Sequence, residues 1–112
     1  MGVVAKVRWF DIWLVNLDPT QGSEFQKTRP AVIVSPDEMN RHIRTIIIAP
    51  MTSVRREYPT RINLTFQRKK GQIVLDQVRT LGKSRLLKRL GRLSDARARD
   101  VADKLTQMFR YA

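Results

Sequence analysis

The feature that most limits the fold of this chain is the distribution of its apolar residues. In the first two thirds they form short runs, rich in β-branched and aromatic side chains and separated by proline, glycine and polar residues. From Ser94 onward they recur instead with the spacing of one helix face. We therefore expect a mainly β fold with α (α+β), a small barrel of short strands with a C-terminal helix. The 112 residues suit a single domain, 1–112.

The turn signals divide the first part of the chain into expected elements. We expect strands at 11–17, 31–35, 44–49 and 60–66, a further strand around 73–75 and its continuation over 76–81. One helical turn is expected over 36–40, since proline and acidic residues are typical of a helix start. Pro50 is expected to end the third strand, and 68–71 to form a turn. The final helix is expected to begin after Ser94 as N-cap and to bury a stripe from Ala98 to Phe109.

Charge is the most informative bulk property. Lys and Arg number 22 against 10 Asp and Glu, a formal net charge of +12. Such an excess attracts polyanions, which include nucleic acid, an anionic membrane surface and an acidic protein. No apolar run approaches the ~20 residues of a membrane-spanning helix, and the N-terminal apolar tract is too short for a signal peptide. We therefore expect a cytoplasmic protein with no membrane contact and, as cysteine is absent, without disulfides.

The residue inventory restricts the chemistry. The single histidine, His42, excludes a mechanism that needs two imidazoles from one chain, and neither paired metal-ligand spacing nor a glycine-rich phosphate loop is present. We expect no metal and no cofactor. Arginine, carboxylate and hydroxyl groups remain. All three occur together between Ser23 and Arg29, and two further hydroxyl residues, Thr52 and Ser53, follow the third expected strand. From spacing alone, the simplest interpretation of the first group is a polar loop in which Glu24 and Arg29 form an ion pair. Thr52 and Ser53 are most simply interpreted as turn residues.

Five short motifs then resemble one known family, in its order and spacing. The chain resembles the MazF/PemK/Kid family of toxin ribonucleases at 13–24 (WLVNLDPTQGSE), 27–35 (KTRPAVIVS), 48–53 (IAPMTS), 74–80 (VLDQVRT) and 90–94 (LGRLS). Each motif is weak by itself, but five in register cover nearly the whole chain.

The resemblance implies both a fold and partners. The fold is an SH3-like barrel of the CcdB/PemK type, and the implied assembly is a homodimer whose RNA channel follows the dimer interface. The implied activity is sequence-specific cleavage of single-stranded RNA, often mRNA, by an enzyme of a type II toxin–antitoxin system. A cognate acidic antitoxin would neutralise it, drawn to basic residues that include Arg85, Lys88, Arg89 and Arg92, and contact with DNA would occur only through the antitoxin complex.

The resemblance also assigns residues. Arg29 matches the catalytic arginine, Thr52 the active-site hydroxyl residue and Glu24 the acidic residue often assigned as general base. Ser23, Phe25, Ser53, Gln77 and Arg79 fall in the segments that contact RNA, and Phe25 could stack on a base.

The chemistry of these side chains agrees with that assignment. RNA supplies its own nucleophile, the 2′-hydroxyl, so a metal-bound water is not required. Glu24 can take the 2′-proton, Arg29 can bind two phosphate oxygens and Thr52 can donate to a non-bridging oxygen. The expected products carry 2′,3′-cyclic phosphate and 5′-hydroxyl ends. No residue of the sequence is assigned as the general acid.

The chain departs from the family pattern at Phe10, where relatives usually carry glycine before the acidic residue of the first strand. A backbone angle that suits glycine would be strained at Phe10. Three alternative functions also stay open from the sequence. They are a gyrase-binding toxin like CcdB, a non-catalytic nucleic-acid-binding barrel and a structural or regulatory interaction protein.

Overall fold

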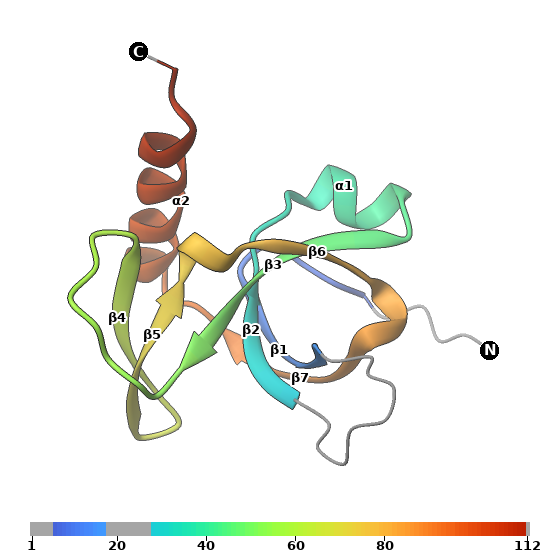
Figure 1. Cartoon of the computed structure of the whole chain (residues 1–112). Helices are drawn as coiled ribbons and strands as arrows, with labels where there is room; N and C mark the ends of the chain where they lie inside the picture. Colours follow the sequence, from blue (N-terminus) through green and yellow to red (C-terminus); the bar gives the residue numbers. More distant parts are fainter. Residues whose placement is uncertain (1–5, 18–27, 112) are drawn as a thin grey trace, which may run out of the picture.

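The computed structural model describes residues 6–17 and 28–111, which form a curled antiparallel sheet with a helix against one side (Figure 1). The strands are β1 (Asp11–Asn16), β2 (Thr28–Ile33), β3 (Thr45–Thr52), β4 (Arg61–Phe66), β5 (Lys69–Val74), β6 (Arg79–Gly82) and β7 (Leu86–Arg92). The helices are α1 (Asp37–His42) and α2 (Asp95–Phe109), with the short 3₁₀ helices η1 (Leu75–Gln77) and η2 (Lys83–Arg85). The expected fold class, a small barrel with a C-terminal helix, is confirmed.

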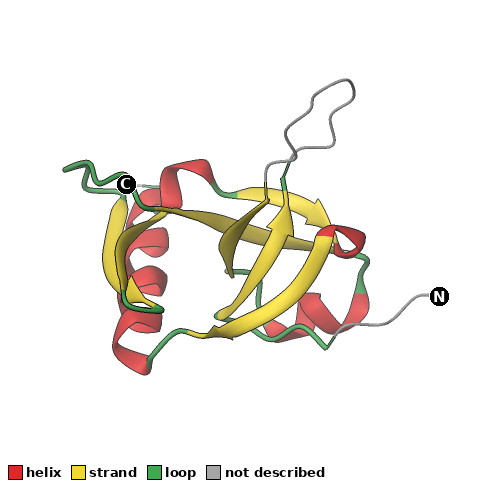
Figure 2. Cartoon of the chain, turned by 90° about the horizontal axis from the view of Figure 1, so that it is seen from below, coloured by secondary structure: helices red, strands yellow, loops and turns green. Residues whose placement is uncertain are grey.

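Strand β3 connects two parts of the sheet, whose strand order is β4-β5-β3-β2-β1-β7. Its first half pairs with β6, from Thr45 opposite Gly82 to Ile48 opposite Arg79. Its end pairs with β5, where Met51 lies opposite Ile73. The curled part of the sheet and the β4–β5 hairpin therefore meet at the end of β3. In Figures 1 and 2, α2 lies on the side of this hairpin and α1 at the opposite end of the molecule.

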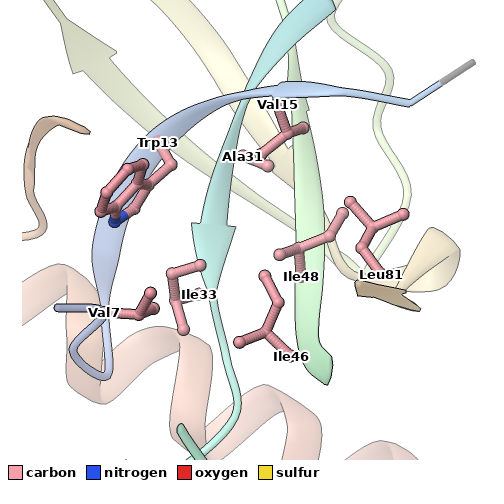
Figure 3. Packing of buried hydrophobic residues seen from close by; sticks show 8 residues of the cluster. All are labelled: Val7, Trp13, Val15, Ala31, Ile33, Ile46, Ile48 and Leu81. Carbon is pink, nitrogen blue, oxygen red and sulfur yellow. The ribbon is translucent and has the colours of Figure 1, made fainter. Parts of the chain in front are cut away.

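Side chains alternate between two hydrophobic clusters, as the two-residue period of a strand requires. Trp13 and Val15 of β1 and Ile33 of β2 point into the cluster shown in Figure 3. Ile12 of β1 and Val32 of β2 point the other way, into the cluster beneath α2. Trp13 belongs to the core, since only 8% of it is exposed.

The C-terminal helix begins and packs as expected, except at its last turn. The Ser94 hydroxyl accepts a hydrogen bond from the Arg97 N–H at 3.2 Å, so Ser94 is the N-cap. Val101 is fully buried, and Leu105 packs against the same cluster. Phe109, expected in the buried stripe, is 70% exposed, because the end of α2 extends beyond the strands (Figure 1).

The expectation that Pro50 ends the third strand was wrong. β3 continues to Thr52, and Pro50 lies opposite Ala31 of β2. Proline is normally excluded from central strands because it lacks an N–H. Here it lies between the part of β3 that pairs with β6, up to Ile48, and the part that pairs with β5, from Met51. The second side of β3 is unpaired at this point, so the missing N–H costs no strand pairing.

Strand β7 was not expected from the sequence, and its pairing changes the role of two basic residues. β7 pairs with β1, and there Arg89 and Arg92 each lie 3.4 Å from the buried carboxylate of Asp11. The same carboxylate accepts a hydrogen bond from the Arg8 N–H at 3.0 Å. Arg89 and Arg92 thus neutralise a buried charge where β1 meets β7, rather than only flanking the helix.

Phe10, which precedes Asp11 where relatives usually carry glycine, adopts a backbone angle that favours glycine. Phe10 has φ of +70°, in the left-handed region that glycine enters without cost. Its N–H donates to the Ile33 carbonyl at 2.8 Å, and its carbonyl accepts from the Leu93 N–H at 3.0 Å. The ring stacks on Trp9 with 5.0 Å between ring centroids and 13° between ring planes. Hydrogen bonds on both sides and ring stacking therefore hold a strained conformation.

Candidate active site

The structure brings two of the predicted catalytic residues together at one pocket. Arg29 is exposed near the start of β2, and Thr52 is half-buried at the end of the neighbouring strand β3. Since these strands are antiparallel with Ala31 opposite Pro50, the start of β2 lies beside the end of β3. Both residues line a cavity of about 660 Å³, a size typical of ligand sites.

In the described part of the chain, three segments that are separated in the sequence form the pocket. They are 28–30 of β2, 51–53 at the end of β3, and the β4–β5 hairpin, which contributes Leu64, Phe66, Gln67 and 69–71. Among the described residues, the lining includes three cationic side chains, Arg29, Lys69 and Lys70, and no acidic one. It is therefore a basic pocket with a partly apolar wall, a combination that suits a ligand with both a phosphate and a flat apolar part.

Local contacts hold Thr52 in position. Its side-chain Oγ1 accepts a hydrogen bond from the Val54 N–H at 3.1 Å, which leaves the hydroxyl hydrogen free to donate. Thr52 also lies opposite Gln72 in the β3–β5 pairing. A Cβ atom on Gly71 would lie only 2.6 Å from the Thr52 carbonyl oxygen. The close approach of β5 to Thr52 therefore requires glycine at position 71.

Gln72 connects the same strand to the polar loop that follows β3. Gln72 is buried, with only 4% exposed, and its side-chain amide is hydrogen-bonded. Nε2 donates to the Arg56 carbonyl and to Asn63 Oδ1, both at 2.8 Å, and Oε1 accepts from the Arg56 N–H at 3.0 Å. This side chain fixes the loop after Ser53 against the hairpin. Gln72 was not expected as a site residue, because an isolated glutamine in a strand belongs to no motif.

The other predicted site residues are separated into two groups. Ser53 is exposed and lines the pocket with Thr52. Gln77 and Arg79 are exposed on η1 and β6, and they do not line the pocket. Ser23, Glu24 and Phe25 lie outside the described residues, so their predicted roles rest on the sequence alone.

The hairpin residues of the pocket were missed as site residues. Ile62, Leu64 and Phe66 of the expected strand 60–66 alternate with polar residues and face the same side. The expected turn at 68–71 was wrong in length, since Phe66 pairs directly with Lys69 and the turn is Gln67–Arg68. Nothing in the local sequence indicated that this hairpin would lie beside Arg29, which is a consequence of the β3–β5 pairing.

One carboxylate near the hairpin has an altered acidity. Asp76 accepts hydrogen bonds from Arg61 at 3.3 Å and from Thr60 at 2.9 Å. The Arg61 guanidinium, above all, lowers the pKa of Asp76 below its usual value, because it stabilises the charged carboxylate. Within 6–17 and 28–111, no group of three or more His, Cys, Asp or Glu residues could hold a metal ion, and no helix is long and apolar enough to cross a membrane.

Comparisons with known proteins agree with this architecture. The model of the family described as PemK-like, MazF-like toxin of type II toxin–antitoxin system matches residues 8–109. A curated relative, Endoribonuclease MazF of Staphylococcus saprophyticus, is 36% identical over 97 residues, which cover 81% of each chain.

Solved structures share the fold. The MazE-MazF complex of Deinococcus radiodurans (Form-II) matches with a TM-score of 0.80 at 24% identity, covering 93% of this chain and 96% of that one. An endoribonuclease in complex with its cognate antitoxin, from a mycobacterial species, matches with a TM-score of 0.79 at 22% identity, covering 95% and 99%. With a family match over most of its length and a relative 36% identical, the chain belongs to the PemK-like, MazF-like toxin family of type II toxin–antitoxin systems.

Proposed function

We propose that this protein is a sequence-specific endoribonuclease that cleaves single-stranded RNA without a metal ion, with the phosphate bound between Arg29 and Thr52. The observation that carries the proposal is the meeting of these two residues at one basic pocket. The name of the Staphylococcus saprophyticus relative, an endoribonuclease, supports the same activity. The family match over residues 8–109 supports treating the whole chain as one toxin domain.

The proposed reaction is a transesterification within the RNA. The 2′-oxygen attacks the adjacent phosphorus, its proton passes to the Glu24 carboxylate, and the bond from phosphorus to the 5′-oxygen breaks. Arg29 binds two non-bridging oxygens as negative charge develops on them. Thr52 donates its hydroxyl hydrogen to the phosphate, with its orientation fixed by the Val54 N–H. The products are a 2′,3′-cyclic phosphate and, once the leaving oxygen gains a proton, a 5′-hydroxyl.

The proposed partners follow from charge and family. The formal net charge of +12 favours both RNA and an acidic antitoxin. Two structural relatives are described as complexes with an antitoxin, which supports a cognate antitoxin for this chain as well. We further propose that the active protein is a homodimer, with Gln77 and Arg79 contacting RNA away from the pocket.

The proposal is tested by incubating the purified protein with a long single-stranded RNA in EDTA, mapping the cuts and identifying the product ends. We expect discrete cuts with 5′-hydroxyl ends. Arg29→Ala should reduce the rate by roughly 10²-fold or more, since removing one donor from a charge-stabilising site has such effects. Thr52→Val should also reduce the rate, whereas Thr52→Ser keeps the hydroxyl and should retain most of it.

Arg41 provides the matched control for the loss of one positive charge. It is exposed on α1, at the end of the molecule opposite the hairpin (Figure 1). Arg41→Ala should cleave like the wild type. Intact RNA after incubation with folded wild-type protein, over several long substrates, would contradict the proposal and favour a binding protein instead.

A further inference from the structure

The turn of the β4–β5 hairpin, Gln67–Arg68, is strained. Phe66 pairs with Lys69, so the strands are joined by two residues, and these have φ of +53° and +68°. A two-residue turn with two positive φ angles is of the type in which asparagine followed by glycine is strongly preferred. Here both positions carry long side chains, which are sterically disfavoured in this conformation.

Only one of the two strained residues contributes to the pocket. Gln67 lines it together with Arg29 and Thr52, whereas Arg68 does not. The wall on this side is partly apolar, formed by Leu64 and Phe66. An amide group beside an apolar wall is suited to a nucleobase, which has flat faces for packing and edges with hydrogen-bond donors and acceptors.

The charges on the rest of the hairpin point to the same class of ligand. Lys69 and Lys70 follow the turn directly and line the pocket beside Gln67. They can bind a further phosphate of a strand whose scissile phosphate lies at Arg29. One pocket thus brings together groups suited to the scissile phosphate, to a base and to a second phosphate.

We propose that Gln67 is a specificity-determining residue, which reads the edge of a nucleobase next to the scissile phosphate while Leu64 and Phe66 contact the base. This inference rests on the proposed ribonuclease function and names the part of the RNA that the hairpin binds. The strained turn brings Gln67 to the lining of the pocket, as strained backbone often does at functional sites.

The test uses the two turn residues as a matched pair. Gln67→Gly and Arg68→Gly each relieve one strained angle, so both proteins should melt at or above the wild-type temperature. Each variant is incubated in EDTA with an RNA library randomised around the wild-type cut site, and the cut products are sequenced. Gln67→Gly should reduce the preference at one position beside the cut by roughly tenfold or more, as expected for loss of a hydrogen-bonded base contact. Arg68→Gly should keep the same preference at every position.

Two outcomes would overturn the inference, and they are distinguishable from each other. If the wild-type protein makes no cuts, the proposed function fails and the inference fails with it. If the wild type cuts with a sequence preference that Gln67→Gly fully retains, only the base-reading role fails.

Discussion

At the scale of single residues, Phe10 shows how the chain keeps a backbone conformation that favours glycine. Its φ of +70° is stabilised by hydrogen bonds to Ile33 and Leu93 and by stacking on Trp9. The side chain also packs against the cluster beneath α2. The strain is therefore offset in part by backbone hydrogen bonds and in part by contacts of the aromatic ring.

Comparison of two truncations at Phe10 separates these contributions. Phe10→Ala and Phe10→Gly both remove the ring, but only alanine retains the steric cost of the positive φ. We expect both variants to be less stable than the wild type, and Phe10→Gly to be more stable than Phe10→Ala by about 1 kcal/mol, the reverse of the order found in ordinary helices. The free energy of unfolding in urea measures this difference. A more stable alanine variant would mean that the angle is not maintained in solution.

The sequence predicted individual residues of the site better than the strands and the hairpin that surround them. The motif containing Arg29 and that containing Thr52 were identified by resemblance, and the pairing of β2 with β3 brings these residues to one pocket. The hairpin wall could not be predicted, because it depends on how β3 changes partners at Pro50. Strand β7 was missed because the segment 86–92 is rich in leucine and basic residues and lacks β-branched ones.

At the scale of secondary-structure elements, the pairing of β3 with β5 determines where Thr52 lies. The two strands approach so closely at Gly71 that a Cβ atom there would lie only 2.6 Å from the Thr52 carbonyl oxygen. Real Cβ atoms do not come that near, so a substitution must displace one of the strands. The effect would reach the pocket directly, since Gly71 and Thr52 both line it.

We expect Gly71→Ala to lower both stability and the rate of RNA cleavage. Overpacking of this kind typically costs 1–3 kcal/mol. Gly82→Ala is the matched control, because the nearest atom to its added Cβ would be Ser84 Oγ at 3.7 Å, an ordinary contact. Urea unfolding and the cleavage assay in EDTA measure the two effects. A Gly71→Ala protein with wild-type stability and rate would show that β3 and β5 can separate at no cost.

At the scale of the whole molecule, the excess of positive charge predicts RNA binding that weakens with salt. For single strands, log K falls with log salt concentration by roughly 0.7 for each phosphate that is neutralised. Lys70→Gln should therefore reduce the magnitude of this slope by roughly 0.7, provided Lys70 binds a phosphate at the pocket. Arg41→Gln, on the opposite end of the molecule, should leave the slope unchanged. Fluorescence anisotropy of a labelled, non-cleavable RNA over a series of salt concentrations gives both slopes.

The position at which the hairpin pairs with β3 also affects how the target sequence of such a toxin can change. Arg29 lies on β2, and Thr52 pairs with Gln72 at the base of the hairpin, away from the turn at Gln67–Arg68. Substitutions at the hairpin turn can thus accumulate with little effect on the barrel or on the groups proposed to act on the phosphate. A new target sequence could then arise in small mutational steps, each of which leaves a folded and active enzyme.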